Sequence, residues 1–297
     1  MIQTKILAHS LHPNGKAELV SFEFTYPRFI HSELMTHRAF TRNAASSRAI
    51  PIKKMIAAVW SNPAMPERWG SNGRGMQDSG VLVGARLAAA RGLWRLGSKA
   101  ACVLAWCLEK AGLHKQIANR VLEPFGHITT IVTTALPGLM NFFGLRAHKD
   151  AQPEFQVLAY QALGAYLSSV PLQLQPGDWH IPMSEDLFLP TFRDLFNLPP
   201  LDKVKVATGR MARTSYLTHH GTRDAAADIE LHDRLSASGH WSPFEHCAHA
   251  ADATALTNRG GNFGAEWVQY RKLFPNELRK LERADLERML REYPAQV

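Results

Sequence analysis

The sequence predicts an α+β fold, because strand-like segments occur among longer segments with helical spacing. Residues 18–26, ELVSFEFTY, alternate in character and place Val20, Phe22 and Phe24 on one apolar face, as in a half-buried strand. Residues 127–135, HITTIVTTA, are rich in β-branched side chains, which favour strands. With 297 residues, 45% of them hydrophobic and 20% charged, the chain can bury the core of one large domain or two smaller ones.

The elements follow in an order that leads from the first strand to a polar segment. Pro27 ends the strand, and apolar residues from Phe29 to Met35 have the spacing of a short helix, which would hold residues 36–48 at its C-terminal end or in the loop beyond it. The later predictions, in chain order, are a Pro/Gly-rich surface loop over 61–80, a helix over 81–107, a helix over 112–125 that Pro124 stops, the strand over 127–135, and helical spacing over 139–167 interrupted near Pro153.

A proline-spotted linker through residues 198–203 divides the chain into two predicted units. Residues 1–200 carry the polar segment and the predicted helices of Arg120 and Arg146. Residues 201–297 form a C-terminal unit that completes the same domain and ends in a charged helix, NELRKLERADLERMLREY, whose alternating signs indicate a solvated face.

Composition limits the compartment and the kinds of partner. Three cysteines, none in a CxxC or zinc-like spacing, indicate a reducing compartment, and we expect a cytoplasmic protein. No apolar run approaches the roughly 20 residues that span a bilayer, and the N-terminus has no run of signal-peptide length, so we expect no membrane partner. A net charge of +8 favours a partner rich in phosphate: nucleic acid, a nucleotide or a dinucleotide cofactor.

Residues 36–50, THRAFTRNAASSRAI, gather several arginines in a segment without an apolar stripe. A solvated basic loop is the simpler interpretation, because most charge runs are only that. Asn43 and Ser46, however, supply short donors between Arg42 and Arg48, and this combination suits phosphate better than a run of lysines would. We therefore favour an anion-binding loop.

Arg120 and Arg146 lie in mostly apolar sequence, where a charge is costly unless something pairs it. An internal salt bridge to Glu123 or Glu154 is one interpretation. The other is that the two arginines converge with the basic loop on one anionic ligand.

Metal and nucleophile motifs are weak in this sequence. His240, Glu245, His246 and His249 lie close together, but they do not form the HExxH pattern of a zinc enzyme, so we predict no metal site. No cysteine stands in a recognisable catalytic motif, and neither GxGxxG nor GxxxxGK[ST] occurs.

Together these segments resemble the flavin-dependent thymidylate synthase family (ThyX), whose signature is R-H-R-x-x-S-x-N-E-x-S-x-R-Y. Residues 36–49 read T-H-R-A-F-T-R-N-A-A-S-S-R-A; the strict matches are His37, Arg38, Asn43, Ser46 and Arg48, Thr41 is a conservative replacement, and Thr36, Ala44 and Ala49 depart from the family's Arg, Glu and Tyr. Further matches at Arg120 to Pro124, at LMNFFGLR and at AQPE extend the resemblance over about residues 18–160.

The order of the motifs looks circularly permuted. The family's A-R-x-S-Y and G-H-x-S-P-x-E-H normally precede the R-H-R motif, whereas here ARTSY (212–216) and GHWSPFEH (239–246) come last. Residues 269–277 match R-H-R-x-x-S-x-N-E at a few offsets, either as a worn second copy or by coincidence. This order implies a ThyX-like fold in which strand 18–26 and strands of the C-terminal unit share one mainly antiparallel sheet, packed by the helices of Arg120 and Arg146.

The resemblance implies reductive methylation of dUMP to dTMP, with FAD as cofactor and with methylenetetrahydrofolate and NADPH as co-substrates. It assigns FAD binding to His37, Arg38, Asn43, Asn141, Ser215 and His246, and substrate binding to Ser46, Arg48, Arg120 and Arg146. Arg146 would also be catalytic, because a guanidinium facing the uracil ring stabilises negative charge that develops there, so that C6 accepts hydride and C5 acts as nucleophile. The family further implies a homotetramer with sites shared between subunits.

Departures from the family pattern keep alternatives open. Glu33 stands where the family usually has Gln, and Ala44 replaces a Glu, so the substrate could be another pyrimidine nucleotide. The basic charge and the lost signature positions favour instead a non-catalytic nucleic-acid-binding protein on a decayed fold, although we expect no specific nucleic acid. Glu277 could supply the missing carboxylate or simply cap the start of the charged helix.

Overall fold

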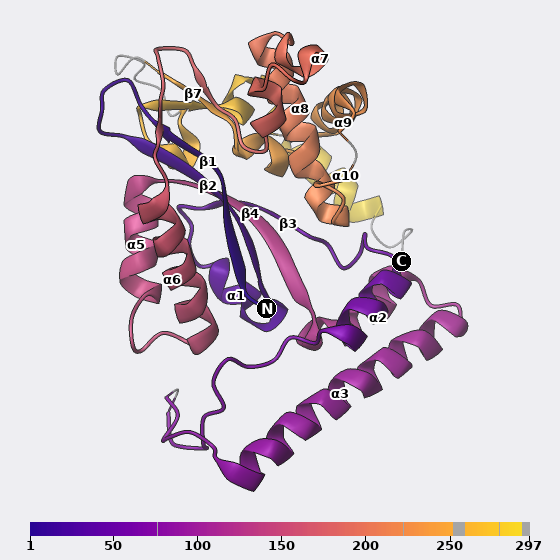
Figure 1. Ribbon diagram of the computed structural model, residues 1–297. Coiled ribbons are helices and arrows are strands. Elements are labelled where there is room, and N and C mark those ends of the chain that lie inside the picture. The colour runs from indigo at the N-terminus through magenta and orange to yellow at the C-terminus, as the bar shows by residue number, and fades with distance from the viewer. Residues whose placement is uncertain (76, 222, 252–258, 279, 293–297) are drawn as a thin grey trace.

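A five-stranded sheet in the order β3-β4-β2-β1-β5 forms the centre of the computed structural model, which describes residues 1–75, 77–221, 223–251, 259–278 and 280–292 (Figure 1). Its strands are β1 (Gln3–Leu11), β2 (Glu18–Pro27), β3 (Thr41–Ala44), β4 (His127–Ala135) and β5 (Leu172–Gln173). All neighbouring pairs are antiparallel except β1 with β5. The α+β class is therefore confirmed.

The two faces of this sheet pack against different parts of the chain. Val20, Phe22 and Phe24 of β2 join a core with α5 (Leu136–Arg146) and α6 (Pro153–Ser168), which lie side by side in Figure 1. On the other face Leu7 and Ile131 pack against side chains of the C-terminal unit. Because strand side chains alternate, the sheet is buried on both sides.

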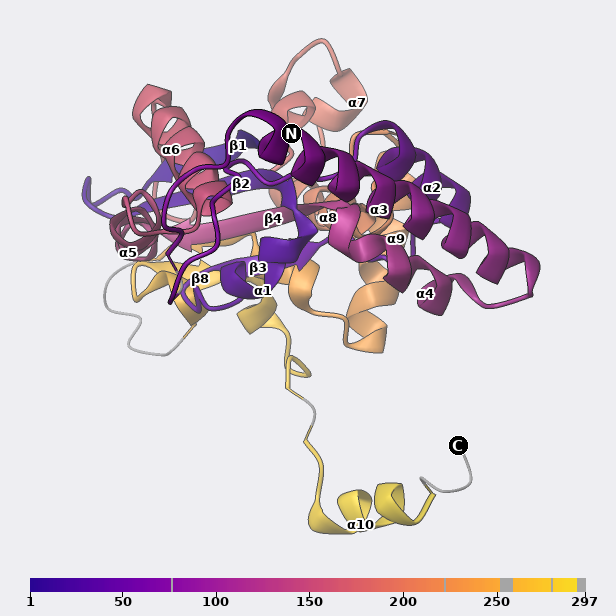
Figure 2. The ribbon, with the colours of Figure 1, turned by 90° about the horizontal axis from the view of Figure 1, so that it is seen from below.

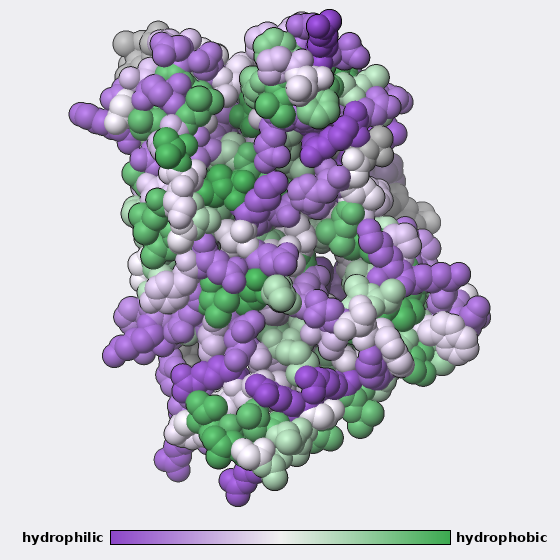
Figure 3. All heavy atoms as spheres, in the orientation of Figure 1, coloured by the Kyte–Doolittle hydropathy of each residue, from purple (hydrophilic) through white to green (hydrophobic). Residues whose placement is uncertain are grey.

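The helices between β3 and β4 extend away from the sheet. They are α2 (Ile52–Ser61), the 27-residue α3 (Gly84–Lys110) and the short α4 (Lys115–Ala118), and α1 (His31–Leu34) precedes β3. α3 packs on α2 but leaves Leu93, Leu96 and Val103 exposed. Figure 3 shows hydrophobic residues along the lower edge of the molecule, where Figure 1 places α3.

A small sheet and several helices follow β5, and the C-terminal unit supplies most of them. β6 (Trp179–His180), β7 (Ala248–Ala250) and β8 (Trp267–Gln269) form an antiparallel sheet of three strands beside α7 (Arg193–Phe196), α8 (Pro200–Ala212) and α9 (Ala225–Ser238). The 3-10 turns of the chain are η1 (Arg28–Ile30), η2 (Asn119–Phe125), η3 (Glu185–Phe188), η4 (Arg213–Tyr216), η5 (Ser242–Glu245), η6 (Gly261–Phe263) and η7 (Tyr270–Leu273). α10 (Arg283–Glu292) has no buried residue and stands apart in Figure 2.

The structure corrects the expectation of one shared sheet. β7 and β8 pair with β6 instead of extending the central sheet, and the C-terminal unit covers that sheet face to face through apolar side chains. The C-terminal unit is nevertheless in contact with β3 and β4. β6 comes from the first predicted unit and pairs with β7 of the second, so the two units share this small sheet. The boundary between them at residue 200 stays a prediction.

Three local predictions also need correction. Residues 112–125 are not one α-helix but α4 followed by the 3-10 turn η2, and Pro124 lies inside that turn. Part of the predicted polar loop, Thr41–Ala44, forms β3 because its backbone pairs with β4. The charged helix begins at Arg283, later than the segment predicted from residue 276, of which residues 279 and 293 lie outside the described residues. No helix in the described ranges is long and apolar enough to cross a membrane.

Candidate functional site

The segment 36–49 crosses the edge of the central sheet, so its side chains reach two different environments. Thr41 and Asn43 of β3 face the C-terminal unit: the Thr41 hydroxyl lies 3.4 Å from Nδ1 of His246, and the Asn43 amide donates to the carbonyl of Met211. Arg42, which alternates with them, points the other way and donates to the carbonyl of Met35 at 2.8 Å. The strand therefore divides the side chains of this segment between its two faces.

A cleft of about 1090 Å³ opens between this segment and the C-terminal unit. Its polar and charged lining consists of Asn43, Ser46, Arg48, Lys115, Gln116, Arg213, Ser215, Tyr216, Thr218, Arg234, Ser238, His240 and Ser242. Four of these side chains are cationic, and no carboxylate lines the cleft within the described residues. Such a lining favours an anionic ligand.

Hydrogen bonds between distant segments hold the walls of this cleft together. The backbone N–H of Ser46 donates to the carbonyl of Ser215 at 3.0 Å, and the hydroxyl of Ser242 donates to Oδ1 of Asn43 at 3.2 Å. The buried amide of Asn119 donates to the carbonyls of Ser47 and Ile50, at 2.6 and 2.9 Å, and so anchors the loop that carries Arg48. The motifs at 212–216 and 239–246 thus meet the signature segment in space.

The cations of the cleft differ in how far they are already paired. Nε of Arg213 lies 2.7 Å from Oδ1 of Asp228, and Nζ of Lys115 donates to the carbonyl of Ala49 at 2.9 Å. Arg48 and Arg234 form no ion pair with any residue that the structure describes. Their charge is therefore available to a ligand.

Arg146 lies in the second environment, on the side of α5 and α6. Its Nε donates to Nε2 of His37 at 2.9 Å, Nη1 lies 3.7 Å from a carboxylate oxygen of Glu33, and the guanidinium sits 4.6 Å from the centre of the Phe155 ring. Burial, together with the charges of Arg146 and Arg42, lowers the pKa of His37 to about 4. His37 is therefore neutral near pH 7. Its Nε2 accepts the hydrogen bond from Arg146 and so holds the guanidinium in place.

Arg120 and Arg146 lie in different environments, contrary to the interpretation that they converge on one ligand. Arg120 is exposed despite its mostly apolar neighbours in the sequence, and its Nη1 lies 3.0 Å from Glu123. The salt-bridge interpretation is thus correct for Arg120 with Glu123. Arg146 pairs with Glu33 and not with Glu154, which instead accepts the backbone N–H of Glu67.

His246 is fully buried behind β3 and β4. Its Nδ1 lies 2.9 Å from the hydroxyl of Thr133, which in turn bonds Ser21, and burial lowers the pKa of His246 to about 3. Nε2 of His246 has no hydrogen-bond partner among the described residues. His246 is therefore a neutral group inside the sheet packing and does not line the cleft.

Of the predicted site residues, the cleft of a single chain gathers Asn43, Ser46, Arg48 and Ser215. His37, Arg38, Asn141, Arg146, Arg120 and His246 lie outside its lining. Arg38 is exposed, with its carbonyl accepting from Asn262 at 3.2 Å, and Asn141 is exposed on α5. The expectation that His37, Arg38, Asn43, Asn141 and His246 line one pocket is thus not met within one chain.

Three cations of the cleft were not predicted. Arg213 is the arginine of the A-R-x-S-Y pattern, which could have indicated it. Lys115 and Arg234 stand in no motif, so no sequence signal pointed to them.

Glu277 has a role that neither interpretation anticipated. Its carboxylate lies 3.0 Å from Nζ of Lys272 and 3.6 Å from Nε of Arg271. α10 begins only at Arg283, so Glu277 does not cap that helix. Glu277 is also absent from the cleft lining.

The chain is similar to a known protein family and to solved structures. Residues 14–172 match a family model described as thymidylate synthase complementing protein. No curated protein matches the sequence. Among solved structures, the chain is similar to the UMP/dUMP methylase PolB from Streptomyces cacaoi bound with 5-Br dUMP, with 21% identity and a TM-score of 0.43 over 52% of this chain and 68% of that one. The same enzyme bound with 5-Br UMP gives 16% identity and a TM-score of 0.47 over 66% and 94%.

Proposed function

The chain belongs to the thymidylate synthase complementing protein family, and we propose that it methylates dUMP to dTMP with FAD, methylenetetrahydrofolate and NADPH. The observation that carries the proposal is the carboxylate-free cleft, in which Ser46 and Arg48 of the signature lie beside further cations. A nucleotide phosphate needs such a set of donors.

Phosphate recognition is assigned to the side of the cleft formed by the loop after β3. Arg48 offers two parallel N–H donors, and Ser46 adds a short hydroxyl. Arg234 and Lys115 line the same cleft and add positive charge. Arg120, which the family resemblance also assigns to substrate, would first have to leave Glu123.

The donor set also fits a flavin dinucleotide. Asn43 and Ser215 lie at the cleft, and its cations suit a pyrophosphate. The amide of Asn43 already bonds Met211 and Ser242, so its part in this chain is to hold the cleft walls in place. A bound flavin would supply the hydride chemistry, while the chain supplies binding and orientation.

Arg146 is proposed to act on the pyrimidine ring. Its planar guanidinium is held by His37 at Nε, which orients the two remaining nitrogens. A fixed positive group of this kind stabilises negative charge that develops on the ring carbonyl, and this makes C5 nucleophilic. No cysteine nucleophile is then required.

Because the cleft and Arg146 lie in different environments, we propose that the complete site forms between subunits of a homo-oligomer. The family resemblance implies a tetramer, in which His37, Arg38 and Asn141 would serve the flavin site. His246, which is fully buried, would contribute only through its contacts behind β3 and β4. The exposed stripe of Leu93, Leu96 and Val103 on α3 supports association, since apolar residues spaced by three and seven positions form one helix face. The proposed setting is the cytoplasm, with no membrane partner and no specific nucleic acid.

A second candidate is methylation of another pyrimidine nucleotide, such as UMP. Glu33 lies 3.7 Å from Arg146, and burial raises the pKa of this carboxyl group. A carboxylate in place of the family's usual Gln changes the charge next to the arginine proposed to face the base. Competition between dUMP and UMP in the same assay would rank the two substrates.

An anaerobic assay tests the proposal. The purified protein, reconstituted with FAD, is incubated with dUMP, methylenetetrahydrofolate and NADPH, and the nucleotide is analysed by mass. We expect a product heavier by one methylene group and a flavin absorbance that copurifies with the protein. A protein that binds no flavin and leaves dUMP unchanged contradicts the proposal and favours the nucleic-acid-binding alternative.

A further inference from the structure

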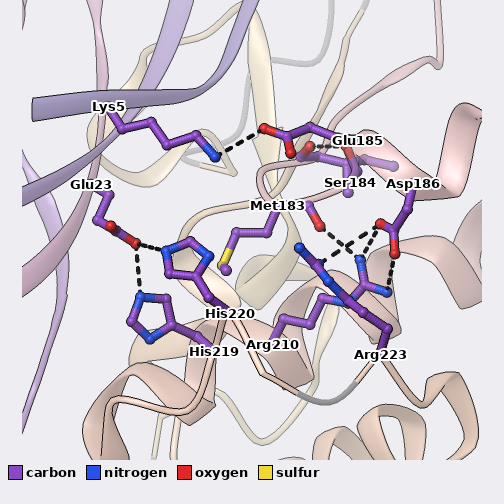
Figure 4. Close-up of polar contacts among 11 residues, drawn as sticks. Lys5, Glu23, Met183, Ser184, Glu185, Asp186, Arg210, His219, His220 and Arg223 are labelled. Atoms are coloured by element: carbon purple, nitrogen blue, oxygen red, sulfur yellow. Dashed lines mark hydrogen bonds and ion pairs between the residues drawn. The ribbon is translucent and has the colours of Figure 1, made fainter.

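A carboxylate and two adjacent histidines from distant parts of the chain meet between the central sheet and the C-terminal unit (Figure 4). Glu23 comes from β2, and His219 and His220 follow η4. Nε2 of each histidine lies 2.7 Å from the same oxygen, Oε2 of Glu23. Within the described residues, this is the one group of three such side chains whose ligand atoms all lie within 4.8 Å of one another.

Among the described residues, only the two histidines pair with the carboxylate of Glu23. Lys5 is the cross-strand partner of Glu23 in the sheet, so its side chain starts on the same face. Its ammonium, however, reaches Glu185 at 3.3 Å, and Figure 4 shows it extended away from the Glu23 carboxylate. No lysine or arginine among the described residues forms an ion pair with Glu23.

Burial of the three side chains is graded. His219 is 5% exposed and the side chain of Glu23 16%, whereas the side chain of His220 is 47% exposed. Two ligands are therefore held by the protein, and the third lies at the solvent boundary. An ion could enter from the side of His220 and keep water in its remaining positions.

We propose that Glu23, His219 and His220 bind a divalent first-row transition metal ion, with Zn²⁺ as the best match. Two imidazoles and one carboxylate are ligands of catalytic and open zinc sites, whereas Mg²⁺ and Ca²⁺ prefer oxygen ligands alone. Binding replaces the two N–H···O bonds: each imidazole presents a lone pair at Nε2 and carries its proton on Nδ1. The ligand atoms must also separate slightly, which the exposed His220 permits.

Sequence spacing could not reveal this site, because Glu23 and His219 are 196 positions apart. The histidines that do stand close in sequence, in GHWSPFEHCAH, are dispersed by the fold. His246 bonds Thr133 inside the sheet packing, and His249 packs edge-on against Trp179. The expectation of no metal site rested on that segment and on the spacing of the cysteines.

The ion would connect the C-terminal unit to the central sheet. Thr218, next to His219, lines the cleft, so the metal would also fix one wall of it. The inference does not rest on the proposed methylation, because it depends only on the three ligands. A structural ion stabilises the folded state, since the unfolded chain has no preformed site.

Metal titration of the full-length protein tests the inference. After treatment with a chelator, the protein is dialysed against Zn²⁺, and bound metal is measured by mass spectrometry. We expect about one ion per chain, a thermal unfolding midpoint raised by several degrees, and a visible absorption band when Co²⁺ replaces Zn²⁺. Glu23→Gln and His220→Ala should both lose the ion and the band.

His148→Ala is the matched control, because His148 is also an exposed histidine beside a carboxylate, 3.6 Å from Asp150. It should retain the metal. Wild-type protein that binds no ion, or variants at Glu23 and His220 that bind as much as wild type, would overturn the inference. If Glu23→Gln fails to fold, the exposed His220→Ala still decides.

Discussion

The cleft and the His37–Arg146 pair both contain residues of the signature segment 36–49, but they differ in how far their arginines are paired with other side chains. In the cleft, Arg48 is exposed and forms no ion pair with any described residue. Arg146 is only 20% exposed and is held by His37, Glu33 and the Phe155 ring. The first arrangement leaves a charge free to attract a ligand, and the second fixes a charge in one orientation.

This difference predicts that binding and turnover separate by region. Changes in the cleft should weaken nucleotide affinity. Changes at the His37–Arg146 pair should lower kcat with little effect on affinity, because an oriented charge acts mainly on the transition state.

Arg146→Lys should have the largest effect. An ammonium cannot reproduce the planar fork or its bond to His37, so turnover should fall roughly a hundredfold, on the order of 3 kcal/mol, with KM for the nucleotide nearly unchanged. Steady-state kinetics with dUMP measure both constants. Turnover close to wild type, or a loss confined to KM, would reject the proposed role of Arg146.

The second-largest expected effect is a loss of folding stability at lower pH, caused by protonation of His37. The pKa of His37 is about 4 in the folded protein, below its ordinary value, so between about pH 6.5 and pH 4 the unfolded chain binds a proton that the folded chain does not. The stability present above pH 6.5 is lost as pH falls, by about 2 kcal/mol at pH 5.

Urea unfolding of wild type and His37→Gln at pH 7 and pH 5 checks this expectation. Glutamine can still accept from Arg146 but does not titrate. The difference in unfolding free energy between the two pH values should shrink in the variant. Equal pH dependence in both proteins would show that His37 does not titrate as the structure implies.

Arg48→Ala should weaken dUMP binding about tenfold, or about 1.5 kcal/mol, because a charged donor to the phosphate is lost. Arg120→Ala is the control, since that guanidinium is already paired with Glu123 and lies outside the cleft lining. Its effect should stay below about threefold. Calorimetric titration measures both, and a larger loss for Arg120 would reverse the assignment.

Glu277→Gln should have the smallest effect. Its ion pairs with Lys272 and Arg271 lie away from the cleft, so the variant should lose about 1 kcal/mol of stability or less and keep its turnover. Thermal unfolding and the activity assay read the two separately. Lost turnover with unchanged stability would support the idea that Glu277 replaces the carboxylate missing at Ala44.

Local patterns predicted much of the fold, and long-range pairing accounts for what they missed. Residues 127–135 form β4 as expected, and β2 spans 18–27, because β-branched composition and alternation are local signals. β1 and α2 were not predicted. The separate sheet of β6, β7 and β8 was not predicted either, since its strands are two or three residues long and find partners far along the chain.

The site shows the same limit. Asn43, Ser46, Arg48 and Ser215 were predicted from motifs and do meet in one cleft. The predicted environment of Arg120 was wrong, because its apolar neighbours in the sequence do not surround it in space. Lys115 and Arg234 enter the cleft from other elements and carry no local pattern.

Calorimetric titration of the FAD-reconstituted protein with dUMP and with deoxyuridine determines whether the carboxylate-free cleft binds a nucleotide through its phosphate. The two ligands differ only in that phosphate. We expect saturable dUMP binding, deoxyuridine binding weaker by at least about tenfold, and loss of that difference in Arg48→Ala. Equal affinity for the two ligands, or a difference that Arg48→Ala leaves intact, would show that the phosphate is not bound by Arg48 in this cleft.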